Sequence, residues 1–407
     1  GSDRSNAAQQ HARPRRSPSC PHRSLTSVDS YRKAAAHLAA VATMPKINDL
    51  IAQKAAKGED WVSYEYFPPR SEQGVKNLEA RFERMKAARM PLFCDMTWGA
   101  GGSTSDLTME LTLKMKQLGL EPNMHLTCTN VAKADVVKAL KTCRDNGVAN
   151  IVALRGDPPV GQDKWEATEG GFECALDLVK FIRETHGDYF CLSVAGYPEG
   201  HPDTIVHVGD SEASLSESER SRCKVVVEDD GTKKVFVCPD ASFKLEMDYL
   251  KKKVDAGADM IITQMFFDAS TYGAFLKECR KCGIDVPVVP GIMLVQAAGG
   301  FRKMTTMCKT RVPEAVAKAV DTRASDDAEL KSYGVDLGVE MSHQLLKYGA
   351  PGLHFYTLNL EKSTLAIADR VAADRAKAAK GEPDWLKLAV GVAAVAGLFA
   401  FALKKRA

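Results

Sequence analysis

Short apolar, β-branched segments alternate with helical patterns along residues 62–358, and this alternation constrains the fold more than any other feature. Alternating strands and helices predict a parallel sheet. Eight such units predict an α/β fold of the closed (β/α)8 type, a TIM barrel. The predicted strands are 62–66, 92–97, 123–128, 150–155, 190–195, 259–264, 286–290 and 352–357. The predicted helices are 75–89, 131–144, 172–185, 243–256, 269–281, 313–320 and 328–347.

The repeat is stretched in two places within a predicted barrel domain of residues 44–380. Residues 203–242 form an insertion after the fifth strand, in which 224–227 and 233–237 flank a turn and predict a β-hairpin. Residues 297–351 contain more helix than one repeat needs. We therefore expect one barrel with an insertion, although length alone would suggest two or three domains.

The two ends of the chain differ in composition from this body. Residues 1–43 contain seven basic and two acidic residues, which is typical of a transit peptide and equally of a disordered leader or upstream sequence before Met44. Residues 388–403 form an uncharged apolar stretch between Trp385 and a basic terminus. We interpret 385–407 as a membrane anchor that leaves the body in the cytoplasm, tethered to an intracellular membrane; the alternative is an apolar helix packed on the body or a partner.

Charge and cysteine content exclude several classes of function. The whole chain has a net charge of +3, but both ends are basic, so the body is acidic and lacks the basic balance of a nucleic-acid-binding domain. Eleven scattered cysteines are typical of reduced thiols in a cytosolic protein. Cys279 and Cys282 form a C-x-x-C pair with no second pair at a zinc-site spacing, so we predict no metal.

Polar residues cluster where the predicted strands end, which is the active-site end of a barrel of this type. Glu65, Asp157 and Gln264 follow or end three different strands, and Gly-rich turns and aromatic residues accompany them. No metalloprotease, Ser–His–Asp or P-loop motif is present. Carboxylates, an amide and aromatic rings suit a planar heteroaromatic ligand, because rings stack on its faces and polar groups fix its edges.

In these motifs the body resembles the FAD-binding catalytic barrel of the methylenetetrahydrofolate reductase family, without a C-terminal regulatory domain. The resemblance covers about residues 50–365 and rests on several motifs in order. They are VSYEYFPPR (62–70), HLTC (125–128), LRGDPP (154–159), GYPEGHP (196–202), the segment 250–268, VPGI (289–292) and LHFYTLN (353–359).

The resemblance implies that NADH or NADPH reduces bound FAD, and that the reduced flavin then delivers hydride to 5,10-methylenetetrahydrofolate to give 5-methyltetrahydrofolate. Glu65 matches the family's catalytic acid, and Asp157 matches the carboxylate that favours the cationic iminium. Gln264, Tyr356 and Gln296 match substrate-contacting positions. The positions matched to FAD binding are Thr97, His125, Leu154, Arg155, Gly156, Asp157, Ala195, Tyr197, His201, Glu246, Lys252 and Lys253. A homo-oligomer, dimer or tetramer, is also implied.

Departures from the family pattern concern the substrate side of the site. Leu294 replaces a proline, Ala298 stands where an aromatic ring would stack, and Leu360 replaces an arginine. No regulatory domain that binds S-adenosylmethionine follows residue 365, so we expect no such feedback. Two other functions stay open from the sequence: a flavin barrel oxidoreductase of the proline dehydrogenase type, and a catalytically silent, membrane-anchored scaffold.

Overall fold

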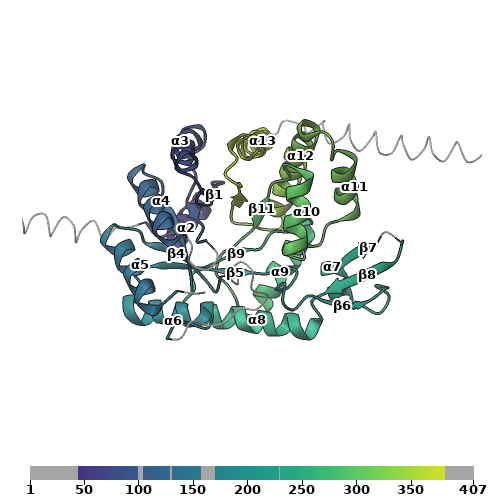
Figure 1. Ribbon diagram of the computed structural model, residues 1–407, viewed down its shortest axis with the longest axis horizontal. Coiled ribbons are helices and arrows are strands. Elements are labelled where there is room, and N and C mark those ends of the chain that lie inside the picture. Colours follow the sequence, from purple (N-terminus) through teal and green to yellow (C-terminus); the bar gives the residue numbers. More distant parts are fainter. Residues whose placement is uncertain (1–44, 100–103, 129–130, 157–169, 229, 381–407) are drawn as a thin grey trace, which may run out of the picture. The chain divides into compact units, whose positions relative to one another are not determined.

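The computed structural model describes residues 45–99, 104–128, 131–156, 170–228 and 230–380 (Figure 1). A parallel sheet of nine strands is surrounded by helices, and a separate three-stranded sheet lies beside it. The predicted leader 1–43 and the predicted apolar helix within 385–407 lie outside the described residues. Among the helices that the structure describes, none combines the length and the apolarity that a membrane crossing requires.

The barrel strands appear where the apolar segments predicted them. They are β1 (Val62–Tyr66), β2 (Cys94–Met96), β3 (Pro122–Thr127), β4 (Asn150–Leu154), β5 (Cys191–Gly196), β9 (Met260–Thr263), β10 (Val288–Val289), β11 (Gly291–Met293) and β12 (Leu353–Tyr356).

The order β10-β9-β5-β4-β3-β2-β1-β12-β11 shows how this sheet closes. Strands β10 and β11 stand at opposite ends of the order, yet only Pro290 separates them in the chain. Proline has no N–H to donate to a ladder, so the two short strands are halves of one interrupted barrel strand. We call each of the eight strand positions of the barrel a stave. Val288 pairs with Ile261 of β9, and Gly291 pairs with His354 of β12, so this stave joins the two edges of the sheet. The predicted eight-stave TIM barrel is confirmed.

Amphipathic helices cover the outside of the barrel (Figure 1). Leu78, Phe82 and Met85 of α3 are fully buried, as their spacing predicted, and Ser71 caps the helix by accepting a hydrogen bond from the Gly74 N–H. The helices of the barrel are α2 (Ile47–Lys57), α3 (Glu72–Ala88), α4 (Ser105–Gln117), α5 (Lys133–Asp145), α6 (Ala175–His186), α8 (Asp240–Asp255), α9 (Ala269–Lys281), α10 (Ala298–Met307), α11 (Glu314–Thr322), α12 (Asp327–Lys347) and α13 (Glu361–Ala379).

The insertion after β5 folds as predicted and adds one strand that the pattern did not show. The predicted hairpin is present as β7 (Lys224–Val227) and β8 (Lys233–Val237), and β6 (Val206–Gly209) pairs antiparallel with β8. The short helix α7 (Glu217–Arg222) begins at Ser216, which forms a capping box with Glu219. A small apolar core, Leu215, Cys223, Val235 and Val237, holds this insertion together.

The amino-terminal ends of the strands enclose a mainly apolar layer, here called the base. Its buried residues come from several strands and from α2: Ile47, Ile51, Trp61, Phe93, Val152, Cys191, Met260, Ile262 and Val289. The first turn of α2 is fixed because the Ile47 N–H donates to Asn150 Oδ1 at 2.9 Å. Helix α2, which the repeat pattern did not predict, thus closes one end of the barrel, and the other end is left for polar chemistry.

Candidate active site at the carboxyl ends of the strands

Alternation along β1 places the acid predicted by the sequence inside the barrel. Tyr66 packs outward against α3, with its ring centroid 4.9 Å from that of Phe82. Because successive side chains of a strand face opposite sides, Ser63 and Glu65 face the interior. We call the carboxyl-terminal end of the barrel, where Glu65 lies, the mouth.

Four ionisable side chains from four strand positions meet below the mouth. His125 Nε2 lies 3.1 Å from Asp95 Oδ2 and 3.6 Å from Glu65 Oε2. His354 Nε2 lies 3.9 Å from the same Glu65 oxygen and 3.8 Å from Asp95 Oδ2. Asp95 and His354 have no exposed side-chain surface, whereas Glu65 is 21% and His125 11% exposed, so Glu65 and His125 are the members that a ligand in the mouth reaches.

The surroundings of His125 favour its cationic form. Burial alone would lower the pKa of His125, but the hydrogen bond to Asp95 and the negative charges of Asp95 and Glu65 outweigh burial and raise it. The ligand atoms of Glu65, Asp95 and His125 lie within 4.8 Å of one another, a spacing that would also suit a cation. The 3.1 Å contact to Asp95 is instead that of a hydrogen bond through a proton on Nε2.

Tyr356 spans the mouth between two strands. Its hydroxyl donates to the Thr263 carbonyl oxygen at 2.5 Å, and burial, followed by the charge of Glu65, raises its pKa well above the ordinary value. The ring fits only because residue 291 is glycine: a Cβ there would lie 2.3 Å from the Tyr356 hydroxyl. Tyr356 is therefore a fixed, neutral wall of the site.

Two amides predicted to contact substrate lie at strand ends around the mouth. Gln264 follows β9. Its backbone N–H donates to the Gly196 carbonyl at 2.8 Å, and its side-chain Oε1 accepts a hydrogen bond from the Met265 N–H. Gln296 follows β11, accepts from Ser363 Oγ at 3.2 Å and buries its Nε2 without a protein partner. Both amides thus have donor capacity for a polar ligand edge.

A second group of predicted residues gathers beside β5. Lys253 Nζ, on the buried face of α8, donates to the Ala195 carbonyl at 2.9 Å. Burial lowers the pKa of Lys253 to about 8, and the negative charge of Glu246 opposes that shift. Glu246 accepts the His201 N–H with both carboxylate oxygens, at 2.9 and 2.8 Å, so α8 fixes the loop that carries Tyr197 and His201. The rings of Tyr197 and His201 meet edge to face at 4.7 Å.

The remaining predicted residues take different positions. Thr97 follows β2 and donates its N–H to the Tyr66 carbonyl at 2.9 Å. Arg155 follows Leu154 at the end of β4 and contacts Asp203 at 3.3 Å, and Gly156 adopts a φ of 91°. Lys252 is exposed on α8, and Asp157 lies outside the described residues.

The mouth offers unpaired polar atoms of the kind a flavin or a pterin would use. Thr127 Oγ1 at the end of β3 and Gln296 Nε2 after β11 are buried without protein partners. Buried polar groups normally form hydrogen bonds, so unpaired ones around one opening indicate a place for a polar ligand. The residues present therefore fit a planar heteroaromatic cofactor.

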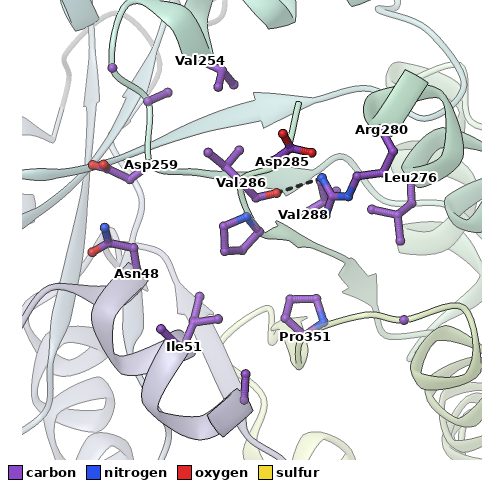
Figure 2. A pocket seen from close by; sticks show the side chains of 16 residues that line it. Asn48, Ile51, Val254, Asp259, Leu276, Arg280, Asp285, Val286, Val288 and Pro351 are labelled. Carbon is purple, nitrogen blue, oxygen red and sulfur yellow. Dashed lines mark hydrogen bonds between the residues drawn. The ribbon is translucent and has the colours of Figure 1, made fainter. Parts of the chain in front are cut away.

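A cavity of about 660 Å³ lies at the base and not at the mouth (Figure 2). Asn48 and Ile51 of α2 line one side, and Val254, Leu276 and Arg280 line the other. Two of its charged groups are already satisfied by the protein: Arg280 donates to the Val286 carbonyl at 3.2 Å, and Asp259 pairs with Arg183 at 2.6 Å. Because both of these charged groups have protein partners, this cavity does not resemble a catalytic site.

The partners of Glu65 were not predicted from the sequence. His125 was expected only as a FAD-binding position, but the structure brings His125, His354, Asp95 and Glu65 together. Asp95 in the middle of a buried strand was the available signal, because an isolated carboxylate in an apolar run must find a partner. The pattern could not identify that partner, since β2 and β3 are separated by a whole helix.

Most of this chain matches one family of known proteins. Residues 50–372 match the family model of methylenetetrahydrofolate reductase. Methylenetetrahydrofolate reductase (NADH) 1 of Zea mays is 44% identical over 323 residues, covering 79% of this chain and 50% of the maize protein. Methylenetetrahydrofolate reductase 2 of Saccharomyces cerevisiae is 38% identical over 330 residues, 80% of this chain and 49% of the yeast protein. The chain therefore spans about half the length of these relatives.

A bacterial relative and a solved structure complete the comparison. The 5,10-methylenetetrahydrofolate reductase of Escherichia coli is 31% identical over 322 residues, 79% of this chain and 93% of the bacterial protein. An uncharacterised protein from Clostridium thermocellum that binds two copies of 5-methyl-5,6,7,8-tetrahydrofolic acid has the same fold, with a TM-score of 0.51, 14% identity, and coverage of 79% of this chain and 99% of its own. By its sequence and its barrel, this chain belongs to the methylenetetrahydrofolate reductase family.

Proposed function

We propose that this chain reduces 5,10-methylenetetrahydrofolate to 5-methyltetrahydrofolate, with NADH or NADPH as the reductant and FAD as the bound cofactor. One observation carries the proposal: Glu65 is partly exposed in the mouth and lies 3.6 Å from the buried His125. A carboxyl group at that place can hold a proton for a ligand nitrogen. Membership in the family supports the choice of substrate.

FAD, when bound, would accept two electrons from the nicotinamide and pass them on as hydride. We assign its binding to the side of the mouth formed by Thr97, His125, Leu154, Arg155, Gly156, Ala195, Tyr197, His201, Glu246, Lys252 and Lys253. The hydrogen bonds of Glu246 to the His201 backbone and of Lys253 to Ala195 support this assignment, since they fix the loop without a ligand. A prepared loop lowers the entropic cost of binding.

The residues of the chain act on the folate by holding and moving protons. Glu65 Oε2 would give a proton to the amine nitrogen that leaves when the five-membered ring opens. Gln264 and Gln296 would fix the pterin edge, and Tyr356 would limit the depth of the pocket. Asp157, by resemblance to the family, would stabilise the cationic iminium, and it lies outside the described residues.

We propose NADH as the physiological reductant. The plant relatives at 44% identity are named for NADH, whereas the Caenorhabditis elegans relative at 32% identity is named for NADPH. Rapid mixing of the oxidised protein with each nicotinamide, without oxygen, measures the bleaching of the flavin directly. Faster bleaching with NADH than with NADPH is expected, and the reverse order would contradict the choice.

Glu65→Gln tests the central assignment. The variant should bind flavin and be reduced by NADH at the wild-type rate, but the second step, oxidation of the reduced flavin by methylenetetrahydrofolate, should slow by about 10²–10⁴-fold because the proton donor is lost. Normal folate turnover in this variant would refute the role of Glu65. A wild-type protein that purifies without a flavin spectrum would refute the enzyme and favour a scaffold.

Two further proposals concern assembly. We propose a homo-oligomer, dimer or tetramer, which light scattering of the purified protein measures. We also propose that 385–407 tethers a cytoplasmic body to an intracellular membrane, which rests on the apolar sequence of that segment alone. Recovery of the full chain in the soluble fraction after cell lysis would contradict the tether.

A further inference from the structure

Asp95 is a carboxylate with no exposed surface, and its partners are all inside the barrel. Asn123 Nδ2 donates to Oδ1 at 2.9 Å, and His125 Nε2 shares a proton with Oδ2 at 3.1 Å. Burying an unpaired charge is costly, so a carboxylate in this position needs a cation beside it. Within the described part of the chain the ion pairs of Asp95 are with His125 and His354 alone, and His125 is the nearer.

We propose that Asp95 is a positioning residue that holds His125 as the imidazolium from which Glu65 takes its proton. This inference rests on the proposed role of Glu65 as the acid of folate reduction, and it extends the site by a carboxylate that lies one layer deeper. Asp95 itself touches no ligand, because its side chain has no exposed surface.

The distances define the proton step. His125 Nε2 lies between Asp95 Oδ2 at 3.1 Å and Glu65 Oε2 at 3.6 Å, so a small turn of the ring brings the proton to either oxygen. In the step the Nε2–H bond breaks and an Oε2–H bond forms. His125 is left neutral with its proton on Nδ1, and no electrons are gained or lost. Water at the mouth then returns a proton to His125.

The groups around His125 explain why it stays charged until it is needed. Glu65 of β1 and Asp95 of β2 face it with negative charge, and together they outweigh burial and raise its pKa. From β12, Tyr356 is kept neutral by burial. His354 also belongs to the cluster, but its Nδ1 is engaged with Ser63 Oγ at 2.8 Å. Removing the charge of Asp95 therefore leaves burial as the dominant influence on His125.

Asp95→Asn tests the inference with nearly the same side-chain shape. We expect the pKa of His125 to fall by at least about one unit. At pH 8, oxidation of the reduced flavin by methylenetetrahydrofolate should slow by about tenfold or more, with recovery as the pH is lowered. Reduction of the flavin by NADH needs no acid and should stay within about twofold of the wild type. A pH profile unchanged from that of the wild type would overturn the proposal.

A control with the same chemical change separates this effect from the general loss of an ion pair. Asp259→Asn makes the same chemical change in a carboxylate that pairs with Arg183 at the base, at 2.6 Å. This variant should lose stability and keep the wild-type pH profile. A shift of the profile in Asp259→Asn equal to that in Asp95→Asn would also overturn the proposal.

Titration of the wild type keeps the test independent of how the variant folds. Nuclear magnetic resonance of histidine labelled at Cε1, with His125 identified by the signal lost in His125→Gln, reports its pKa in the oxidised flavoprotein. A neutral His125 at pH 6.5, or a stoichiometric metal ion retained on Nε2, would overturn the proposal. If the wild type reduced no folate, the proposed function and the delivery of the proton to Glu65 would fail, while the titration of Asp95→Asn would still decide whether Asp95 holds His125 charged.

Discussion

The base and the mouth of this barrel bury side chains of opposite chemistry. At the base, α2 and residues of β4, β5, β9 and β10 bury a mainly apolar cluster, from Ile47 to Val289, next to the buried amide of Asn150. Towards the mouth, β2, β3 and β12 bury Asp95, His125 and His354. A single strand shows the change: within β4, Val152 belongs to the apolar layer, and Arg155 follows the end of the strand beside the proposed flavin site.

This difference separates the energetics of folding from those of catalysis. Apolar burial at the base stabilises the barrel without geometric demands beyond good packing. Polar burial at the mouth adds little net stability, since each charged group must be taken out of water. The two ends should therefore respond to substitution in opposite ways, and three measurements examine that contrast.

Ile47→Ala should produce the largest effect on stability. Ile47 is fully buried beneath the barrel, and truncating such a side chain costs about 2–5 kcal/mol of unfolding free energy because a cavity replaces lost contacts. Denaturant unfolding measures the loss. Folate kinetics should stay at the wild-type level, the reverse of the result expected for Glu65→Gln. A large loss of folate turnover in a folded Ile47→Ala variant would show that the base also affects catalysis at the mouth.

Two buried carboxyl groups, one near each end of the barrel, should make the free energy of unfolding depend on pH. Burial raises the pKa of Glu199, in the loop after β5, to about 8, and that of Glu121, which bonds Asn150 near the base, to about 7. A raised folded-state pKa means that the folded protein holds the proton more tightly than the unfolded chain. The stability contributed by each proton is therefore present below pH 4.5 and is lost as the pH rises towards the folded-state value.

The variants Glu199→Gln and Glu121→Gln should each remove one of these pH dependences of the unfolding free energy, and the two should do so over different pH ranges. The difference in unfolding free energy between wild type and variant should change by about 1.4 kcal/mol per pH unit within the window, up to pH 8 for Glu199 and only up to pH 7 for Glu121. Urea unfolding from pH 4.5 to 9 measures both curves. Identical windows would show that the Arg311 N–H, which donates to Glu199 at 2.7 Å, offsets more of the burial than the structure indicates.

The sequence predicted the barrel because its information is local and repeated. Each strand pattern stood alone, so the eight staves and the hairpin at 224–237 could be found one at a time. Glu65 and Gln264 could be proposed as site residues for the same reason, since they lie at strand ends next to recognisable turns. Asp95 was not, because its role depends on Glu65, His125 and His354 arriving from other strands. Helix α2 was missed because it repeats nothing and serves only to close the base.

Arg280→Ala should have the smallest effect, and it asks whether the cavity at the base communicates with the mouth. Arg280 is exposed and holds the turn before β10 by donating to the Ile284 and Val286 carbonyls. Losing hydrogen bonds that water can replace should cost about 1 kcal/mol or less, visible as a small fall in the melting temperature. Both flavin half-reactions should be unchanged. The strand β10 continues through Pro290 into β11, which pairs with Tyr356 of β12. A change of more than about twofold in the rate of the folate step would therefore mean that this interrupted stave transmits strain from the base to the mouth.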